Sequence, residues 1–301
     1  MSKAIVLGAL VSMFLAGPVA AQAPEPRVHR EFALGEKIPR GWDKVGKVEG
    51  LLSEDWWTKK TGNTISFARE VDLPYVNEVV DGLEQSYSAN RAFLGITPPQ
   101  LPLEFYFCSM DQDASHQPKF HRWLGRANRF SGVALNGTKM CCVNLGNSRA
   151  SRPYAPWEMA ETARHEMNHL FAFQLGGRDR KNSWGWLYEA LAHTIENTSK
   201  SSSAQLNPAL IKSFMKGYRA VDASWAVLIR ERDNQEQEQY RDYDKLLVSI
   251  IYFLQDSYGQ NCIAKLMSNC RGKDLEDALV QTFGKGAAEL ETAWKNYYGI
   301  R

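Results

Sequence analysis

The stretch RHEMNHLF, residues 164–171, carries a histidine, a glutamate and a second histidine in the order H-E-x-x-H. On a helix, residues four positions apart lie one above the other, so His165 and His169 would project from the same face. Two neutral imidazoles at this spacing can bind one Zn²⁺, and Glu166 can reach a water molecule on that metal. The alternative is a pair of core histidines that hydrogen-bond to carbonyl groups.

The residues around this motif have the pattern of a long helix. Pro156 is well placed as its first residue, because proline is favoured at the first position of a helix. Gly176-Gly177 predicts its end. Apolar residues at helical spacing would give it a buried face: Met159, Ala163, Leu170 and Phe173. The motif is therefore expected on a helix, as the shared metal requires.

A third ligand is expected from a second helix, WLYEALAHTIE, which starts at Trp186. Glu189 falls in its first turn, and a helical hairpin across Gly176-Gly177 could bring its carboxylate to the metal. Two imidazoles, one carboxylate and an open position for water form the arrangement of a catalytic zinc site. From the spacing alone, a surface position for Glu189 is an equal alternative.

Together, HEMNH at 165–169 and WLYEALAHTIE at 186–196 resemble the gluzincin metallopeptidases, particularly the peptidase MA-like group. That group has HExxH, a spacer of about twenty residues and then W-L-x-E-G-x-A-x-x-x-E. The similarity extends over roughly residues 61–300, although only the two metal-helix motifs are specific. Ala190 stands where the family usually has glycine, which is an exchange of one small residue for another.

The resemblance implies roles for individual residues. It makes His165, His169 and Glu189 the ligands of Zn²⁺, and it makes Glu166 the general base. Glu196 matches the second acidic position of the motif and would orient a ligand histidine. His193 lies one helical turn after Glu189. It is an alternative ligand or an ordinary core or surface histidine.

A hydrolase also needs a hydrogen-bond donor for the oxyanion that forms during attack on a carbonyl group. Related gluzincins often use a tyrosine or histidine from their helical half. Tyr243 is the expected donor here and Tyr240 is the second candidate. An aromatic residue that packs the start of a helix is the alternative for both.

The order of the elements predicts an α+β fold. Strands are expected at 64–69 and 103–108, and a hairpin at 131–135 and 139–145 around Asn136-Gly137. A helix is expected over 73–94, a shorter one near 118–124, and only helices after Trp186: 186–198, 206–218, 220–232, 239–257, 260–270, 274–283 and 286–298. With the resemblance, this implies a zincin-like fold in which a small mixed sheet with helices precedes an all-α subdomain, with the active site in the cleft between them.

The first residues have the pattern of a signal peptide, with Lys3, an apolar run and small residues before a cut after Ala21. An uncleaved membrane anchor is the alternative. The expected organisation is a signal peptide at 1–21, an N-terminal segment at 22–60 and a peptidase domain at 61–301. This domain would consist of an α/β half at 61–177 and a helical half at 178–301. The chain is expected to be exported, either periplasmic or secreted.

The composition is that of a globular protein, with 44% hydrophobic residues and a formal net charge of +2. This charge gives no electrostatic reason to expect nucleic acid or an anionic membrane surface as a partner. After the signal peptide, no stretch is apolar enough to span a bilayer. Five cysteines are present, and a bridge from Cys108 to Cys141 or Cys142 is plausible. Cys262 and Cys270 lie about 12 Å apart along one helix, too far for a disulfide.

The resemblance therefore implies an exported zinc-dependent metallopeptidase that hydrolyses a peptide or protein substrate, with Glu166 as general base. The strand at 132–135 is the expected sheet edge where an extended peptide could add. One alternative is a secreted zincin-fold protein that binds zinc or a partner without efficient catalysis. Another is a zinc amidase or esterase that acts on a non-peptide substrate.

Overall fold

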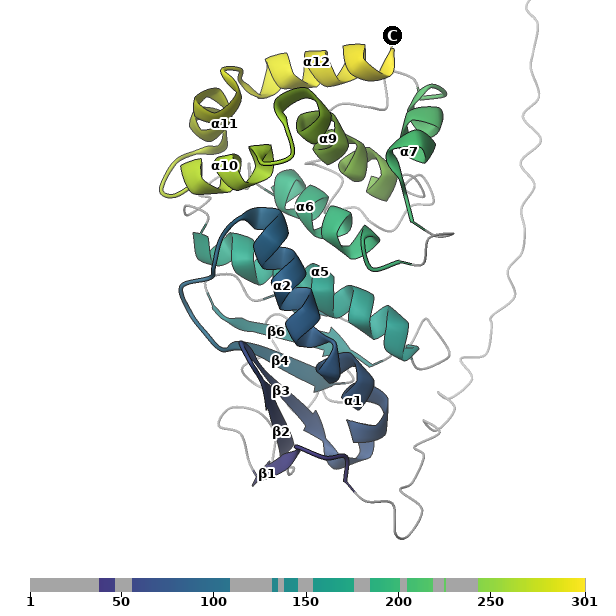
Figure 1. Ribbon diagram of the computed structural model, residues 1–301, viewed down its shortest axis with the longest axis vertical. Helices are drawn as coiled ribbons and strands as arrows, with labels where there is room; N and C mark the ends of the chain where they lie inside the picture. Colours follow the sequence, from purple (N-terminus) through teal and green to yellow (C-terminus); the bar gives the residue numbers. More distant parts are fainter. Residues whose placement is uncertain are drawn as a thin grey trace, which may run out of the picture.

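One mixed sheet joins the strands of the described chain in the order β1-β2-β3-β4-β6-β5 (Figure 1). This computed structural model describes residues 38–46, 56–108, 132–134, 138–145, 154–175, 185–200, 205–218, 225 and 243–300. The strands are β1 Asp43–Gly46, β2 Trp56–Thr61, β3 Thr64–Arg69, β4 Leu103–Cys108, β5 Gly132–Ala134 and β6 Met140–Asn144. β3, β4 and β6 are parallel, whereas β1, β2 and β5 run antiparallel to their neighbours. The fold is α+β, as predicted.

The helices stack in layers away from the sheet (Figure 1). Their bounds are α1 Leu73–Asp81, α2 Leu83–Leu94, α5 Pro156–Leu175, α6 Gly185–Asn197, α7 Pro208–Met215, α9 Tyr243–Tyr258, α10 Cys262–Asn269, α11 Leu275–Phe283 and α12 Ala287–Tyr298. α1 and α5 pack on the sheet, and α2 packs beside α5. α6 lies on α5, and α9 lies on α6 with α7, α10 and α12 around it. The two helices that carry the predicted metal ligands are therefore neighbours.

The strands with clear alternation form where they were predicted. β3 and β4 have the predicted bounds, and β5 and β6 form the predicted antiparallel hairpin. β5 is one of the two edge strands of the described sheet, which confirms the prediction of an edge there. The turn at Asn136-Gly137 lies outside the described residues. The helix predicted over 73–94 is interrupted at Gly82, so that α1 and α2 are separate.

The N-terminal segment at 22–60 contributes two strands that its sequence pattern does not indicate, because β1 and β2 extend the sheet before residue 61. β2 joins β3 through Gly62 and Asn63, a two-residue hairpin loop in which Gly62 has φ 52°. Trp56 is fully buried. Trp42 is also buried, and its Nε1 donates a hydrogen bond to Asn77 Oδ1 on α1 at 2.9 Å. These tryptophans hold the first strands to the core.

The predicted helices after residue 186 are confirmed as α6, α7 and α9 to α12, with ends that differ by a few residues. The helix predicted at 118–124 lies outside the described residues, and so does the one at 220–232 except for Trp225. The predicted signal peptide also lies outside them. Within the described part of the chain, no helix has both the length and the apolar character needed to cross a bilayer.

The setting of α5 is determined by apolar and polar contacts together. Its buried residues pack on the sheet face that carries Phe105 and Val143. On its flank, Asn168 Nδ2 donates to Asn90 Oδ1 on α2 at 2.9 Å, in a fully buried position. A buried amide pair tolerates little rotation, because an unpaired buried polar group costs about 1–3 kcal/mol. This pair directs the face with His165 towards α6.

The described cysteines are unbridged. Cys141, Cys142, Cys262 and Cys270 are free thiols in buried positions. The predicted bridge from Cys108 to Cys141 or Cys142 is therefore wrong. Cys108 lies opposite Asn144, so Cys142 is displaced by two residues on the neighbouring strand, about 8 Å away and beyond disulfide reach. The prediction that Cys262 and Cys270 do not pair is confirmed.

Candidate metal centre

The candidate site lies where α5 meets α6. α5 presents His165, Glu166 and His169, and α6 presents Glu189 four residues into its length. The two helices are packed against each other, and both carry small, fully buried residues: Ala163, Ala172, Ala190 and Ala192.

Three potential ligand atoms converge in this contact. His165 Nε2 and His169 Nε2 are 3.0 Å apart, and each lies 3.5 Å from Glu189 Oε2. The three side chains are between 7% and 13% exposed. One nitrogen from each imidazole and one carboxylate oxygen thus face the same point.

This triangle fits a zinc ion. For sides of 3.0, 3.5 and 3.5 Å, a point about 2.05 Å from every corner lies about 0.7 Å outside the plane. In a regular tetrahedron with bonds of that length, the centre also lies about 0.7 Å from the plane of three corners. The donor set of two histidines and one glutamate is one that catalytic zinc uses. The residues present therefore fit the metal, and their role as ligands stays a prediction.

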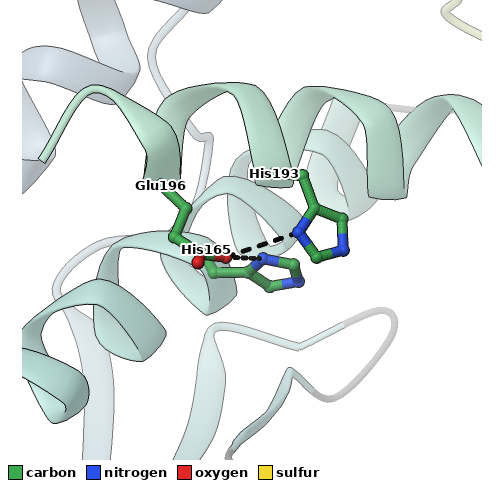
Figure 2. Close-up of side chains that lie close together, drawn as sticks. All are labelled: His165, His193 and Glu196. Atoms are coloured by element: carbon green, nitrogen blue, oxygen red, sulfur yellow. Dashed lines mark hydrogen bonds and ion pairs between the residues drawn. The ribbon is translucent and has the colours of Figure 1, made fainter. Parts of the chain in front are cut away.

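Glu196 contacts His165 at Nδ1, the ring nitrogen that does not face the other two candidate ligands. Its Oε2 lies 3.0 Å from His165 Nδ1 and accepts a hydrogen bond from it (Figure 2). Its Oε1 lies 3.1 Å from Lys200 Nζ. In the neutral ring, a proton on Nδ1 would leave the lone pair of Nε2 directed at Glu189 and His169, as a metal ligand requires. A carboxylate in this position also makes the imidazole a more basic ligand.

His193 forms a second group with the same carboxylate (Figure 2). Its Nδ1 lies 3.5 Å from Glu196 Oε2, its Nε2 lies 3.6 Å from Asp244 Oδ1, and its ring contacts that of His165 edge to face. His165, His193 and Glu196 are thus also close enough together to hold an ion. The first group is the better metal site, because Lys200 already neutralises Glu196 and the Nδ1 atom of His165 serves as a donor to it.

The electrostatics of the site favour a positive charge at its centre. Burial opposes charge on His165, but hydrogen bonds to Glu189 and Glu196 outweigh it and hold the pKa of His165 well above its usual range. Burial would raise the pKa of Glu189. The charge of His169 and hydrogen bonds from both histidines outweigh it, so the pKa of Glu189 lies well below its usual range. His169 Nδ1 is buried without a hydrogen-bond partner among the described residues.

Glu166 lies beside this group in a buried position, 7% exposed. Burial raises its pKa, although the nearby His169 and His165 and a hydrogen bond from the Ala134 N–H oppose the rise. A buried carboxylate with a raised pKa is a stronger proton acceptor than one in water. Burial and the neighbouring histidines thus act on the Glu166 pKa in opposite directions, and burial prevails.

Tyr243 begins α9 and is buried, with its ring centroid 6.5 Å from that of His193. It therefore packs against the outer side of the histidine cluster, and its role as an oxyanion donor stays a prediction. Tyr240 lies outside the described residues. Asp244, which the sequence analysis did not single out, follows Tyr243 and reaches His193. No local signal could have found it, because only the packing of α9 on α6 brings it there.

Comparison with known proteins gives no family assignment: no protein-family model matches the chain, and no curated protein matches its sequence.

Proposed function

We propose that this protein is an exported zinc-dependent metallopeptidase of the gluzincin type, with a zincin-like fold. The observation that supports it best is the convergence of His165 Nε2, His169 Nε2 and Glu189 Oε2 within 3.5 Å of one another. Glu166, the buried acid next to His165, completes the set of groups that zinc-dependent hydrolysis needs.

In the proposal, His165, His169 and Glu189 hold the metal, and Glu196 keeps His165 in the tautomer with a free Nε2. When bound there, zinc would lower the pKa of a water molecule and polarise a carbonyl oxygen. The two imidazoles bring no charge and Glu189 brings one negative charge. The site therefore keeps a net positive charge with which to stabilise an oxyanion.

Glu166 is the proposed general base. Its carboxylate accepts the proton of the attacking water and later transfers it to the nitrogen of the leaving amine. The first step requires an ionised carboxylate, and the second requires that the acid give the proton up again. The raised pKa of Glu166 favours both steps, because it brings the proton affinity of the carboxylate closer to that of the attacking water and of the leaving amine.

The edge strand β5 is the proposed binding place for an extended peptide. β5 is paired only with β6 among the described strands, and Gly132 and Ala134 lie directly against Glu166. A peptide added to this edge by main-chain hydrogen bonds would pass beside the base. Tyr243, at the start of α9, is the proposed donor to the oxyanion, and the substrate would lie between the two halves of the domain.

The test compares Glu166→Gln with Glu161→Gln, which removes the same charge one to two turns earlier on α5. Casein-like, short-peptide, and non-peptide amide and ester substrates are each assayed with zinc content measured in parallel. Glu166→Gln is expected to keep the metal and lose about 10²- to 10⁴-fold in kcat, whereas Glu161→Gln keeps most activity. An undiminished rate in Glu166→Gln would sink the mechanism. Hydrolysis of only the non-peptide substrates would favour an amidase or esterase, and zinc binding without turnover would favour a binding protein.

A further inference from the structure

Gly132 of β5 lies so close to the side chain of Glu166 that an added Cβ would have to displace it. A Cβ at this position would lie 2.7 Å from Glu166 Cγ, 2.7 Å from Thr162 Cγ2 and 2.8 Å from Glu166 Oε1. All three distances are shorter than carbon and oxygen atoms accept without movement of one partner. Only a residue without a Cβ therefore leaves the side chains of Glu166 and Thr162 where they are, at a point where the sheet edge meets the acid of the H-E-x-x-H motif.

Ala134, two residues further along β5, makes the second contact. Residues two apart on a strand point to the same face, so Gly132 and Ala134 both lie towards α5. The N–H of Ala134 donates a hydrogen bond to the Glu166 carboxylate. On the neighbouring strand, Cys141 pairs with Ala134 and is fully buried. The Glu166 side chain thus occupies the space beside Gly132 where a Cβ would lie, and its carboxylate accepts the N–H of Ala134.

These contacts limit the rotamers of Glu166. A glutamate has three rotatable bonds, and its free side chain would spread over many conformations. The backbone of β5 blocks those that swing towards the sheet, and the Ala134 N–H favours the one observed. Catalysis by a base depends on placement, since a displacement of about 1 Å can lower the rate by about 100-fold.

We propose that β5 is the positioning element of the general base, with Gly132 acting through close approach and Ala134 through its N–H. The inference rests on the proposed role of Glu166. It adds that the strand expected to bind the substrate also positions the general base. Substrate binding and the placement of Glu166 would therefore be coupled through the backbone of β5. A substrate that pairs with β5 would steady the base, and a shorter one would lose kcat as well as affinity.

The kinetic test is Gly132→Ala, with Gly217→Ala as a matched control. Gly217 lies after α7, and its nearest neighbour to an added Cβ is the Phe214 carbonyl oxygen at 3.6 Å. Gly132→Ala is expected to lose about 10- to 100-fold in kcat with KM nearly unchanged. Zinc content should match that of Gly217→Ala, and the melting temperature should stay above the assay temperature. A kcat equal to that of the control would overturn the inference.

The second test needs neither metal nor turnover. Hydrogen exchange of the Ala134 amide is measured in the metal-free protein and in Glu166→Ala, with amides of α9 as reference. The inference predicts that the Ala134 amide exchanges about tenfold faster or more in Glu166→Ala, and also in Gly132→Ala if that variant folds. Unchanged exchange of Ala134 in Glu166→Ala would show that the carboxylate does not hold it.

The two tests separate the inference from the proposed function. If Glu166→Gln loses turnover while Gly132→Ala keeps the kcat of its control, the proposed function stands and the positioning role fails. If no substrate is hydrolysed but the Ala134 amide depends on Glu166, the contact stands and the proposed function fails.

Discussion

Replacement of Glu196 should weaken zinc binding without removal of any ligand. Glu196 Oε2 accepts the Nδ1–H of His165 at 3.0 Å, and this bond fixes the tautomer that leaves Nε2 free. Loss of such a partner typically costs about 10- to 100-fold in metal affinity, which corresponds to about 1.4–2.7 kcal/mol. A hydrogen bond to a charged group is roughly twice as strong as a neutral one. Glu196→Gln, which can still accept, should therefore lose about tenfold, and Glu196→Ala about 100-fold.

The assay is competition for zinc with a chromophoric chelator at fixed pH and salt. Glu161→Gln is the matched control, because Glu161 also interacts with Lys200 but is not a partner of His165. The dissociation constant for zinc is expected to be lowest for the wild type and Glu161→Gln. It should be higher for Glu196→Gln and highest for Glu196→Ala. Equal affinities for all four proteins would refute the argument that Glu196 orients His165.

The remaining predictions concern stability and thiols. Free zinc at about 1,000 times its Kd should stabilise the protein by about 4 kcal/mol, so a chelator lowers the melting temperature, and His169→Ala should abolish this dependence. Asn197 hydrogen-bonds to both the N–H and the C=O of Leu206, which follows α6. Asn197→Ala should therefore lower the free energy of unfolding in urea by about 1–3 kcal/mol and leave zinc affinity unchanged. A loss of unfolding free energy below about 0.5 kcal/mol would contradict this. Alkylation of the unreduced, denatured protein should modify Cys141, Cys142, Cys262 and Cys270, and a disulfide-linked peptide containing any of them would contradict the structure.

The predicted elements that the structure reproduces are those with a strong local pattern. β3 alternates buried and half-buried residues along its length, and α5 begins at the proline expected to start it. β2 was missed because Trp56 to Thr61 does not alternate in polarity. Its signal was the two-residue loop Gly62-Asn63, which is typical of a hairpin and was present in the sequence.

The residues of the candidate site also fall into those that a local pattern predicts and those that it does not. The two histidines of α5 lie together because their spacing on one helix dictates it. Glu196 could also be anticipated, because it matches the second acidic position of the motif WLYEALAHTIE. By contrast, Gly132, Ala134 and Asp244 reach the site from β5 and α9, and only the packing of whole elements brings them there. Long-range contacts of this kind leave no periodic trace in the sequence.

The central claim is that His165, His169 and Glu189 hold one zinc ion. X-ray absorption at the zinc edge, with zinc content measured on the same sample, tests it most directly. The account predicts one zinc per chain with nitrogen and oxygen neighbours at about 2.0–2.2 Å, and none after His165→Ala/His169→Ala substitution. Scattering from sulfur at about 2.3 Å, or one zinc retained in the double variant, would contradict it.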